Sequence, residues 1–276
     1  MKTGNHLLKY LSPGLDSASL ANRNRNAKRL STMTISLLRE PRRFAPLGSD
    51  SGGDLPKLRG IVFDVDGTLC IPQTWMFGQM RSALGIDKST DILDYIHSLP
   101  TPDQELAQDK IRAIERSAMS SQEPQPGLVP LMEYLERHNI PKGICTRNFD
   151  APVTHLLEKF LTGKEFKPIV TRQFKPPKPH PAGILHIAKS WGLIDEAGDV
   201  GDASHMIMVG DSLDDMTAGY QAGAATVLLV NEINAHLANH EHTDMVVSRL
   251  DELIELLESG YVGKTPEEKT AIQGLA

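Results

Sequence analysis

The chain has 276 residues, enough for one large domain or two modest ones, and its 40% hydrophobic and 23% charged residues are typical of a globular protein. Its two cysteines are too few for a disulfide framework or a four-thiolate zinc site, so we expect a reducing compartment. No apolar run approaches the length of a membrane-spanning helix, and the formal net charge of −6 argues against nucleic-acid binding.

The charge is divided unevenly along the chain. Residues 1–49 contain nine Lys or Arg against two acidic residues, and many Ser and Asn. A basic, acid-poor start is typical of organellar targeting peptides, so residues 1–50 are a candidate mitochondrial import signal. The alternatives are a cytoplasmic protein in which residues 1–56 form a disordered basic segment, or a start at Met33. Gly, Ser and Pro over residues 46–56 predict a linker into the folded part.

From Leu58 onward, short β-branched apolar runs alternate with amphipathic stretches. The runs predict buried strands at 60–63, 143–145, 168–171, 206–209 and 226–230, with a weaker sixth at 245–247. Apolar residues at helical spacing lie between or after them, at 128–135, 184–188 and 250–257. Strands separated by helices predict an α/β fold, a Rossmann-like parallel sheet with helices on both faces.

One connection is much longer than a crossover requires. Residues 72–126 contain no convincing strand and show helical periodicity at 76–84 and 106–119. We therefore expect a small α-helical cap, inserted after the first strand and lying over the edge of the sheet where α/β proteins bind ligands. Trp75, Phe77 and Met80 are expected in its core. The α/β core is then predicted at residues 57–71 and 127–276.

Acidic residues follow two of the predicted strands. Asp64 and Asp66 lie in Asp-Val-Asp-Gly-Thr-Leu directly after the first strand, where Gly67 lets backbone amides approach a small anion. Asp211 and Asp215 lie in Gly-Asp-Ser-Leu-Asp-Asp after a later strand. Carboxylates this close repel one another unless a cation neutralises them, and an oxygen-only ligand set favours Mg²⁺. An acidic turn and a helix N-cap with solvated acids are the structural alternatives.

Two further polar segments contain groups that fit a phosphate. Thr146 ends the second predicted strand, and Arg147 and Asn148 follow it. Lys178 lies in a proline-rich entry to a predicted helix. Lys175 in the same segment is a competing candidate, and either lysine alone would usually be solvated.

In this order, the four segments resemble the motifs of the haloacid dehalogenase-like hydrolase superfamily, over about residues 58–258. Within it, the chain is similar to the phosphoglycolate-phosphatase-like branch with a helical cap after the first motif, especially to fungal hydrolases with no assigned substrate. The resemblance implies a Mg²⁺-dependent phosphatase that hydrolyses a small-molecule phosphomonoester through an aspartyl-phosphate intermediate. The roles it implies are nucleophile (Asp64), general acid and base (Asp66), phosphate ligands (Thr146, Arg147 and Lys178) and Mg²⁺ ligands (Asp64, Asp66, Asp211 and Asp215).

Other functions stay open at this point. A phosphomutase shares every catalytic group but protects its phosphoenzyme from water until a second hydroxyl arrives. A metal-free dehalogenase as a rule lacks the second Asp of the first motif, so Asp66 argues against it. A regulatory protein on a degenerate hydrolase fold is disfavoured, because clustered carboxylates without a ligand are costly. No pattern in the sequence names the substrate, the cap residues that select it or the oligomeric state.

Overall fold

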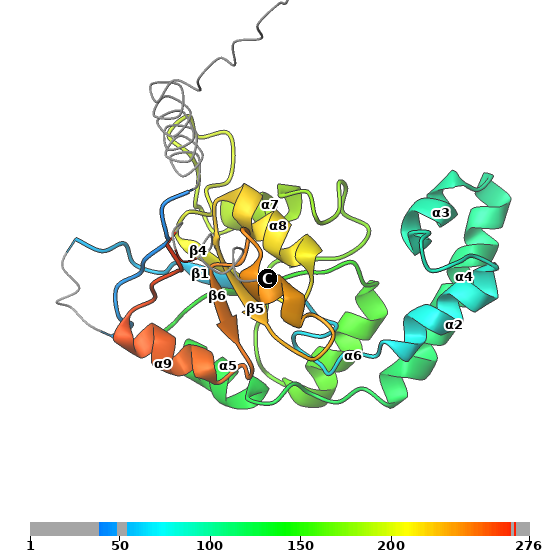
Figure 1. Cartoon of the computed structure of the whole chain (residues 1–276), viewed down its shortest axis with the longest axis horizontal. Coiled ribbons are helices and arrows are strands. Elements are labelled where there is room, and N and C mark those ends of the chain that lie inside the picture. Colours follow the sequence, from blue (N-terminus) through cyan, green and yellow to red (C-terminus); the bar gives the residue numbers. More distant parts are fainter. Residues whose placement is uncertain (1–38, 49–53, 266–267, 269–276) are drawn as a thin grey trace, which may run out of the picture. The chain divides into compact units, whose positions relative to one another are not determined.

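The computed structural model describes residues 39–48, 54–265 and 268 (Figure 1). The candidate import signal up to residue 38 and the alternative start at Met33 lie outside the described residues. None of the described helices is long and apolar enough to span a membrane.

The core is one parallel sheet with the strand order β3-β2-β1-β4-β5-β6. Its strands are β1 (Gly60–Phe63), β2 (Lys142–Cys145), β3 (Ile169–Val170), β4 (Met206–Gly210), β5 (Ala225–Leu229) and β6 (Met245–Val247). The predicted α/β fold and its six strands are confirmed, with differences of one or two residues at the strand ends. The chain moves from β1 to β2 on one side and later to β4 on the other side, so β1 and β4 are neighbours although about 140 residues separate them.

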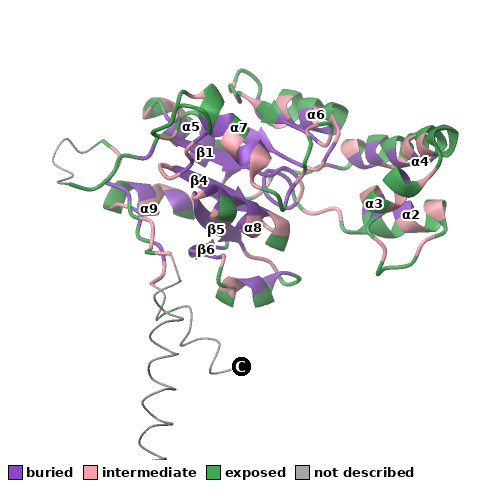
Figure 2. Cartoon of the chain, turned by 90° about the horizontal axis from the view of Figure 1, so that it is seen from above, coloured by how far each residue is buried: buried purple, intermediate pink, exposed green. Residues whose placement is uncertain are grey.

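Helices cover both faces of the sheet, and the alternation of side chains along each strand decides which face receives which residue. Ile61 and Phe63 of β1 pack with the helices of one face, whereas Val62 packs with those of the other. Figure 2 shows the buried strands between helices that are buried on one side and exposed on the other. The first face carries α5 (Leu128–Arg137), α6 (Asp150–Phe160) and α9 (Glu252–Ser259), and the second carries α7 (Ala182–Ser190) and α8 (Leu213–Ala222).

The described end of the basic segment and the first residues of the expected linker pack against the core. Phe44 is 1% exposed, and its ring centre lies 5.6 Å from that of Tyr261. The backbone N–H of Phe44 donates to the carbonyl of Tyr261, and that of Leu47 donates to the carbonyl of Leu257. The packed part of the chain therefore begins before the predicted boundary at residue 57, because the Phe44 ring supplies a large apolar surface in a segment that is otherwise basic and polar.

The long connection forms three helices, α2 (Trp75–Leu84), α3 (Ile92–Ser98) and α4 (Thr101–Ser120), drawn in cyan to green in Figure 1. They share an apolar cluster of their own, in which Met76 and Met80 are buried. The prediction for Met80 is confirmed, but it is wrong for Trp75 and Phe77, which are 42% and 44% exposed. Met76 and Met80 are four residues apart and so occupy one face of α2, which turns Trp75 and Phe77 away from the cluster.

Candidate active site

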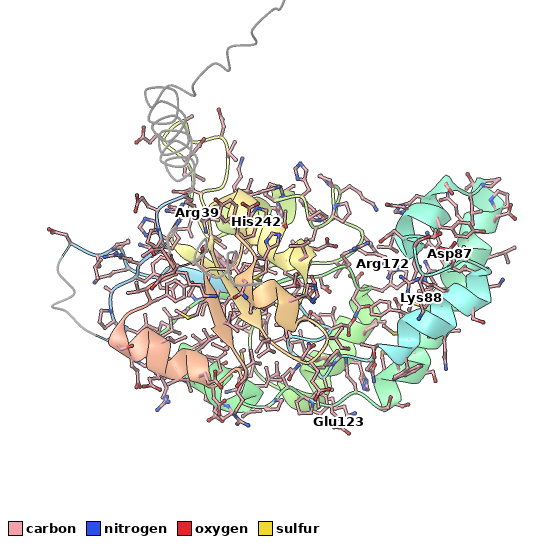
Figure 3. All side chains as sticks on the ribbon, viewed as in Figure 1. Arg39, Asp87, Lys88, Glu123, Arg172 and His242 are labelled. Carbon is pink, nitrogen blue, oxygen red and sulfur yellow. The ribbon has the colours of Figure 1, made fainter. Side chains whose placement is uncertain are left out.

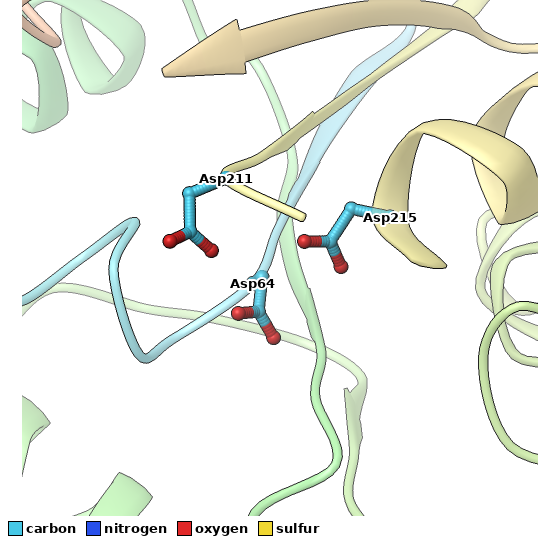
Figure 4. Close-up of side chains that lie close together, drawn as sticks. All are labelled: Asp64, Asp211 and Asp215. Atoms are coloured by element: carbon cyan, nitrogen blue, oxygen red, sulfur yellow. The ribbon is translucent and has the colours of Figure 1, made fainter. Parts of the chain in front are cut away.

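Three carboxylates meet at the carboxyl edge of the sheet (Figure 4). Asp64 follows β1, Asp211 follows β4, and Asp215 lies in the first turn of α8. One carboxylate oxygen from each lies within 4.8 Å of the others. Because β1 and β4 are adjacent and parallel, their carboxyl ends lie side by side, and the structure brings these three predicted residues together.

Two glycines permit the close approach. Gly67 has a φ of +83°, and a Cβ atom on it would lie 2.0 Å from Oδ2 of Asp211. A Cβ atom on Gly210 would lie 2.3 Å from the Cβ atom of Asp215. A side chain at either position would push a carboxylate out of the cluster, so the site requires both glycines, and the turn in addition requires Gly67.

Lys178 lies between Asp64 and Asp215. Its Nζ donates to Oδ1 of Asp64 at 2.7 Å and also to Oδ1 of Asp215, and its side chain is 4% exposed. The competing Lys175 is exposed, with its Nζ 3.3 Å from Nε2 of His97. The structure therefore places Lys178 rather than Lys175 at the carboxylate cluster.

Asp215 serves the helix and the site at once. Its Oδ2 accepts hydrogen bonds from the backbone N–H and the hydroxyl of Ser212, at 3.0 and 2.6 Å, and this pair forms the capping box of α8. Its Oδ1 accepts from Lys178. The N-cap of the structural alternative is present, but Asp215 is buried rather than solvated. The cap orients the carboxylate that accepts from Lys178.

Burial and the neighbouring carboxylates raise the pKa values of Asp64 and Asp211. Burial raises the pKa of Asp64 to about 7; Lys178 opposes this shift and Asp215 adds to it. Burial, with Asp215 and Asp64, raises the pKa of Asp211 to about 8. Burial alone would lower the pKa of Lys178, but Asp215 and Asp64 raise it. A single lysine does not neutralise three carboxylates, so the donor set and its charge fit a divalent cation that prefers oxygen.

Asp66 is held by a separate set of contacts. Its Oδ2 accepts from Nδ2 of Asn148 at 2.6 Å, and the thiol of Cys70 lies 3.6 Å from its Oδ1. Burial raises the pKa of Asp66, against the opposing hydrogen bonds. Thr146 is buried, and its hydroxyl accepts from the backbone N–H of Asn148 at 3.2 Å. The sequence marks Asn148 only as a neighbour of Thr146, and its place three residues beyond the end of β2 was the signal that could have found it.

Arg147 differs from its expected role as a phosphate ligand. Its Nη1 donates to Asp214 of α8 at 2.6 Å, and its Nη2 donates to Asp91, the N-cap of α3, at 2.9 Å. Each terminal nitrogen of the guanidinium thus has a carboxylate acceptor, one from the core and one from the cap. Arg147 therefore connects cap and core in this structure.

A cavity of about 410 Å³ separates the carboxylate cluster from the cap. Asp64, Asp66, Thr146, Lys178 and Asp211 line it from the core. From the cap it is lined mainly by apolar side chains, among them Met76, Phe77, Met80 and Ile92, and by three charged ones, Arg81, Asp91 and Glu115. The cavity accounts for the exposed Phe77. Glu115 lies four residues after Ile111, on the buried face of α4, and a charged residue on that face was the signal in the sequence that could have found it.

The model of the haloacid dehalogenase-like hydrolases matches residues 58–223. The chain belongs to this family. The predicted family is thereby confirmed. The chain is 46% identical over 211 residues to an uncharacterised hydrolase of Saccharomyces cerevisiae, and the alignment covers 74% of this chain and 93% of the yeast protein. It is 27% identical over 231 residues to a phosphoglycolate phosphatase of Pseudomonas savastanoi pv. phaseolicola, with coverage of 73% and 80%.

Solved structures agree with the fold. A hydrolase from Pseudomonas syringae aligns with a TM-score of 0.60 and 20% identity, over 72% of this chain and 98% of that one. At this identity the likeness concerns the fold alone.

Proposed function

We propose that this haloacid dehalogenase-like hydrolase is a Mg²⁺-dependent phosphatase that hydrolyses the phosphomonoester of a small metabolite. The observation that carries the proposal is the position of Lys178 against Asp64, with Asp211 beside them at the floor of a cavity. A carboxylate that attacks a phosphate dianion must overcome repulsion between like charges. A buried ammonium group in contact with that carboxylate supplies part of the compensating charge, and an acid-rich pocket beside it fits a cation that supplies the rest.

The residues present fit Mg²⁺. Carboxylate oxygens of Asp64 and Asp211, with the main-chain carbonyl of Asp66, would hold the ion, while Asp215 supports the site through Lys178. When bound, the ion supplies positive charge that neutralises the phosphate and keeps Asp64 ionised. The raised pKa values of Asp64 and Asp211 support this assignment, because they reflect negative charge that Lys178 leaves uncompensated.

The reaction then proceeds in two displacements at phosphorus. A carboxylate oxygen of Asp64 attacks phosphorus while the bond to the ester oxygen breaks, and protonated Asp66 gives its proton to the leaving alcohol. Asp66 next takes a proton from a water molecule, whose oxygen attacks phosphorus and releases phosphate and the Asp64 carboxylate. The raised pKa of Asp66 supports its role as the initial proton donor. The phosphatase named among the relatives supports this reaction class.

The test is release of inorganic phosphate from a panel of small phosphomonoesters, with and without Mg²⁺. We expect release only with the ion, and acid quenching followed by mass spectrometry should locate a phosphoryl group on Asp64. Transfer of the phosphoryl group to a second hydroxyl without release would contradict hydrolysis and identify a phosphomutase instead.

We place this activity in the cytoplasm or, with residues 1–50 acting as a targeting peptide, in mitochondria. The basic composition of that segment supports the second location. A fluorescent reporter fused behind residues 1–50 tests it, and a diffuse signal would exclude import.

A further inference from the structure

One ion pair in the cavity takes no part in the proposed phosphoryl transfer. Glu115 lies on α4 of the cap and is 3% exposed, and Arg172 lies just after β3 in the core, on the side toward the cap helices (Figure 3). Nη2 of Arg172 donates to Oε1 of Glu115 at 3.0 Å. Both residues line the cavity that contains Asp66. The proposed leaving oxygen lies next to Asp66, so this pair is placed to contact the leaving group rather than the phosphate.

The guanidinium of Arg172 is fixed from three directions. Its Nε donates to the carbonyl of Arg147 at 3.0 Å, its Cζ lies 3.5 Å from the centre of the Phe149 ring, and Nη2 is bound to Glu115. Its Nη1 is buried and has no hydrogen-bond partner among the described residues. A buried donor without an acceptor costs free energy, so this rigid group presents one nitrogen that a ligand would satisfy.

We propose that Arg172 and Glu115 recognise a hydroxyl group of the alcohol that leaves, next to its ester oxygen. The hydroxyl oxygen accepts from Nη1 of Arg172, and the hydroxyl hydrogen is donated to the Glu115 carboxylate. This inference rests on the proposed function, because it requires the ester to be bound at Asp64. The substrate class is then a phosphate ester of a polyhydroxy compound.

A hydroxyl fits this pair better than a carboxylate does. It donates and accepts at once, whereas a carboxylate only accepts. Glu115 already neutralises Arg172, and Asp66 lies in the same cavity, so an acidic leaving group would meet a paired arginine and two acids. Arg81 of α2 also lines the cavity and is the competing candidate for an acidic leaving group.

Three esters with the same two-carbon skeleton separate these possibilities. Ethyl phosphate has no second polar group, 2-hydroxyethyl phosphate has a hydroxyl, and phosphoglycolate has a carboxylate. We would measure kcat/KM for each with Mg²⁺ at pH 8, because burial raises the pKa of Glu115 to about 7 and the residue should be ionised. We expect 2-hydroxyethyl phosphate to exceed both other esters by at least about tenfold, since a site built for a hydroxyl discriminates against analogues that lack it.

Variants assign the preference to the pair. Glu115→Gln leaves Arg172 charged and unpaired, so the ratio of kcat/KM for 2-hydroxyethyl phosphate to that for phosphoglycolate should fall about tenfold. Arg172→Lys removes the planar donor and should lower the ratio for 2-hydroxyethyl phosphate to ethyl phosphate. Glu105→Gln, an exposed change on the same helix, is the matched control and should alter neither ratio. Both kcat/KM values of a ratio are measured on the same preparation, so a smaller fraction of folded protein lowers both equally and leaves the ratio unchanged.

Equal or undetectable rates on the three esters, with para-nitrophenyl phosphate still hydrolysed, would overturn this inference and leave the proposed function standing. A wild-type preference for phosphoglycolate would also overturn it; loss of that preference in Arg81→Gln would assign the recognition to Arg81. No phosphate release from any ester, para-nitrophenyl phosphate included, would contradict the proposed function and this inference with it.

Discussion

The core and the cap line the same cavity in different ways. The core places its groups at the ends of buried strands and fixes them with short contacts, such as Lys178 to Asp64 at 2.7 Å with both side chains almost fully buried. The cap meets the core through charged pairs, and in one of them Arg147 and Asp91 are 34% and 41% exposed. The exposed pair of Arg147 and Asp91 can therefore change at a smaller energetic cost than the buried contacts at the strand ends or the buried pair of Arg172 and Glu115. Mutations of the buried core groups should therefore reduce activity more than mutations of the exposed pairs between core and cap.

Asp64→Asn should give the largest effect. Asn keeps the shape of Asp but is not a nucleophile, so kcat should fall by about 10⁴-fold or more. The midpoint of thermal unfolding should stay near that of the wild type, and Asp199→Asn, an exposed acid remote from the cavity, should change neither quantity. Phosphate release near the wild-type rate would remove Asp64 from its proposed role.

Removal of divalent ions tests the carboxylate cluster as a whole. Activity should fall below detection in a chelator and return with Mg²⁺, because Lys178 alone leaves the cluster negatively charged. Full activity of chelator-treated, metal-free protein would contradict the proposed ion site.

Asp66→Asn should slow hydrolysis of an alkyl phosphate by about 10²–10⁴-fold, the usual contribution of a general acid. The loss in the first step should be smaller for para-nitrophenyl phosphate, whose leaving group departs without a proton. A uniform loss for both esters, measured as single-turnover rates, would indicate that Asp66 acts by another route.

The stability of the metal-free protein should depend on pH because of the carboxylate cluster. The pKa of Asp211 is raised to about 8 and that of Asp64 to about 7, so the folded, metal-free protein binds these protons more tightly than the unfolded chain. The contribution of these two groups to the free energy of unfolding therefore falls as the pH rises from about 4 to about 8. Mg²⁺ requires the ionised carboxylates, so its affinity should increase with pH, by about tenfold per pH unit for each proton released, and level off above about pH 8.

Differential scanning fluorimetry at pH 6 and pH 8.5, with and without Mg²⁺ at constant ionic strength, measures this linkage. The increase in Tm on adding Mg²⁺ should be larger at pH 8.5. An equal increase at both pH values would show that the ion binds away from the two carboxylates.

Arg147→Gln should give the smallest effect of the series. Its pairs with Asp91 and Asp214 are about one-third exposed, so each contributes no more than about 1 kcal/mol, and kcat/KM should fall only about two- to tenfold. The loss should shrink in high salt, which screens exposed pairs. Arg112→Gln, which breaks an exposed pair within α4, is the matched control. A loss of kcat/KM as large as that of Asp66→Asn and insensitive to salt would indicate that Arg147 binds the phosphate.

The core was predictable in detail because local chemistry and topology agree there. Apolar β-branched runs predicted the strands, and an acid that follows such a run is carried to the same edge of the sheet whatever its distance along the chain. Gly67 was expected to let backbone amides approach an anion, and its close approach to Asp211 is seen only in the folded structure.

The cap was less predictable for a physical reason. α3 has seven residues, too few for a clear periodic pattern, and Trp75 and Phe77 were expected in a core that Met76 and Met80 occupy. Charged side chains of the cap have several geometrically possible partners, and only the packing of helices on the sheet selects among them. Arg147 illustrates this, since its neighbours in the sequence indicated a phosphate and its neighbours in space are carboxylates.

The sequence by itself determined the α/β class, the family, the positions of Asp64, Asp66 and Asp211 after strand ends and that of Lys178 before a helix, because these depend on local periodicity and on the rule that parallel strands share an edge. Only the tertiary structure decided that Lys178 rather than Lys175 contacts Asp64, that Asn148 holds Asp66, and that Glu115 meets Arg172. These are contacts between side chains far apart in the sequence, and their partners are set by how the elements pack rather than by any pattern within one element.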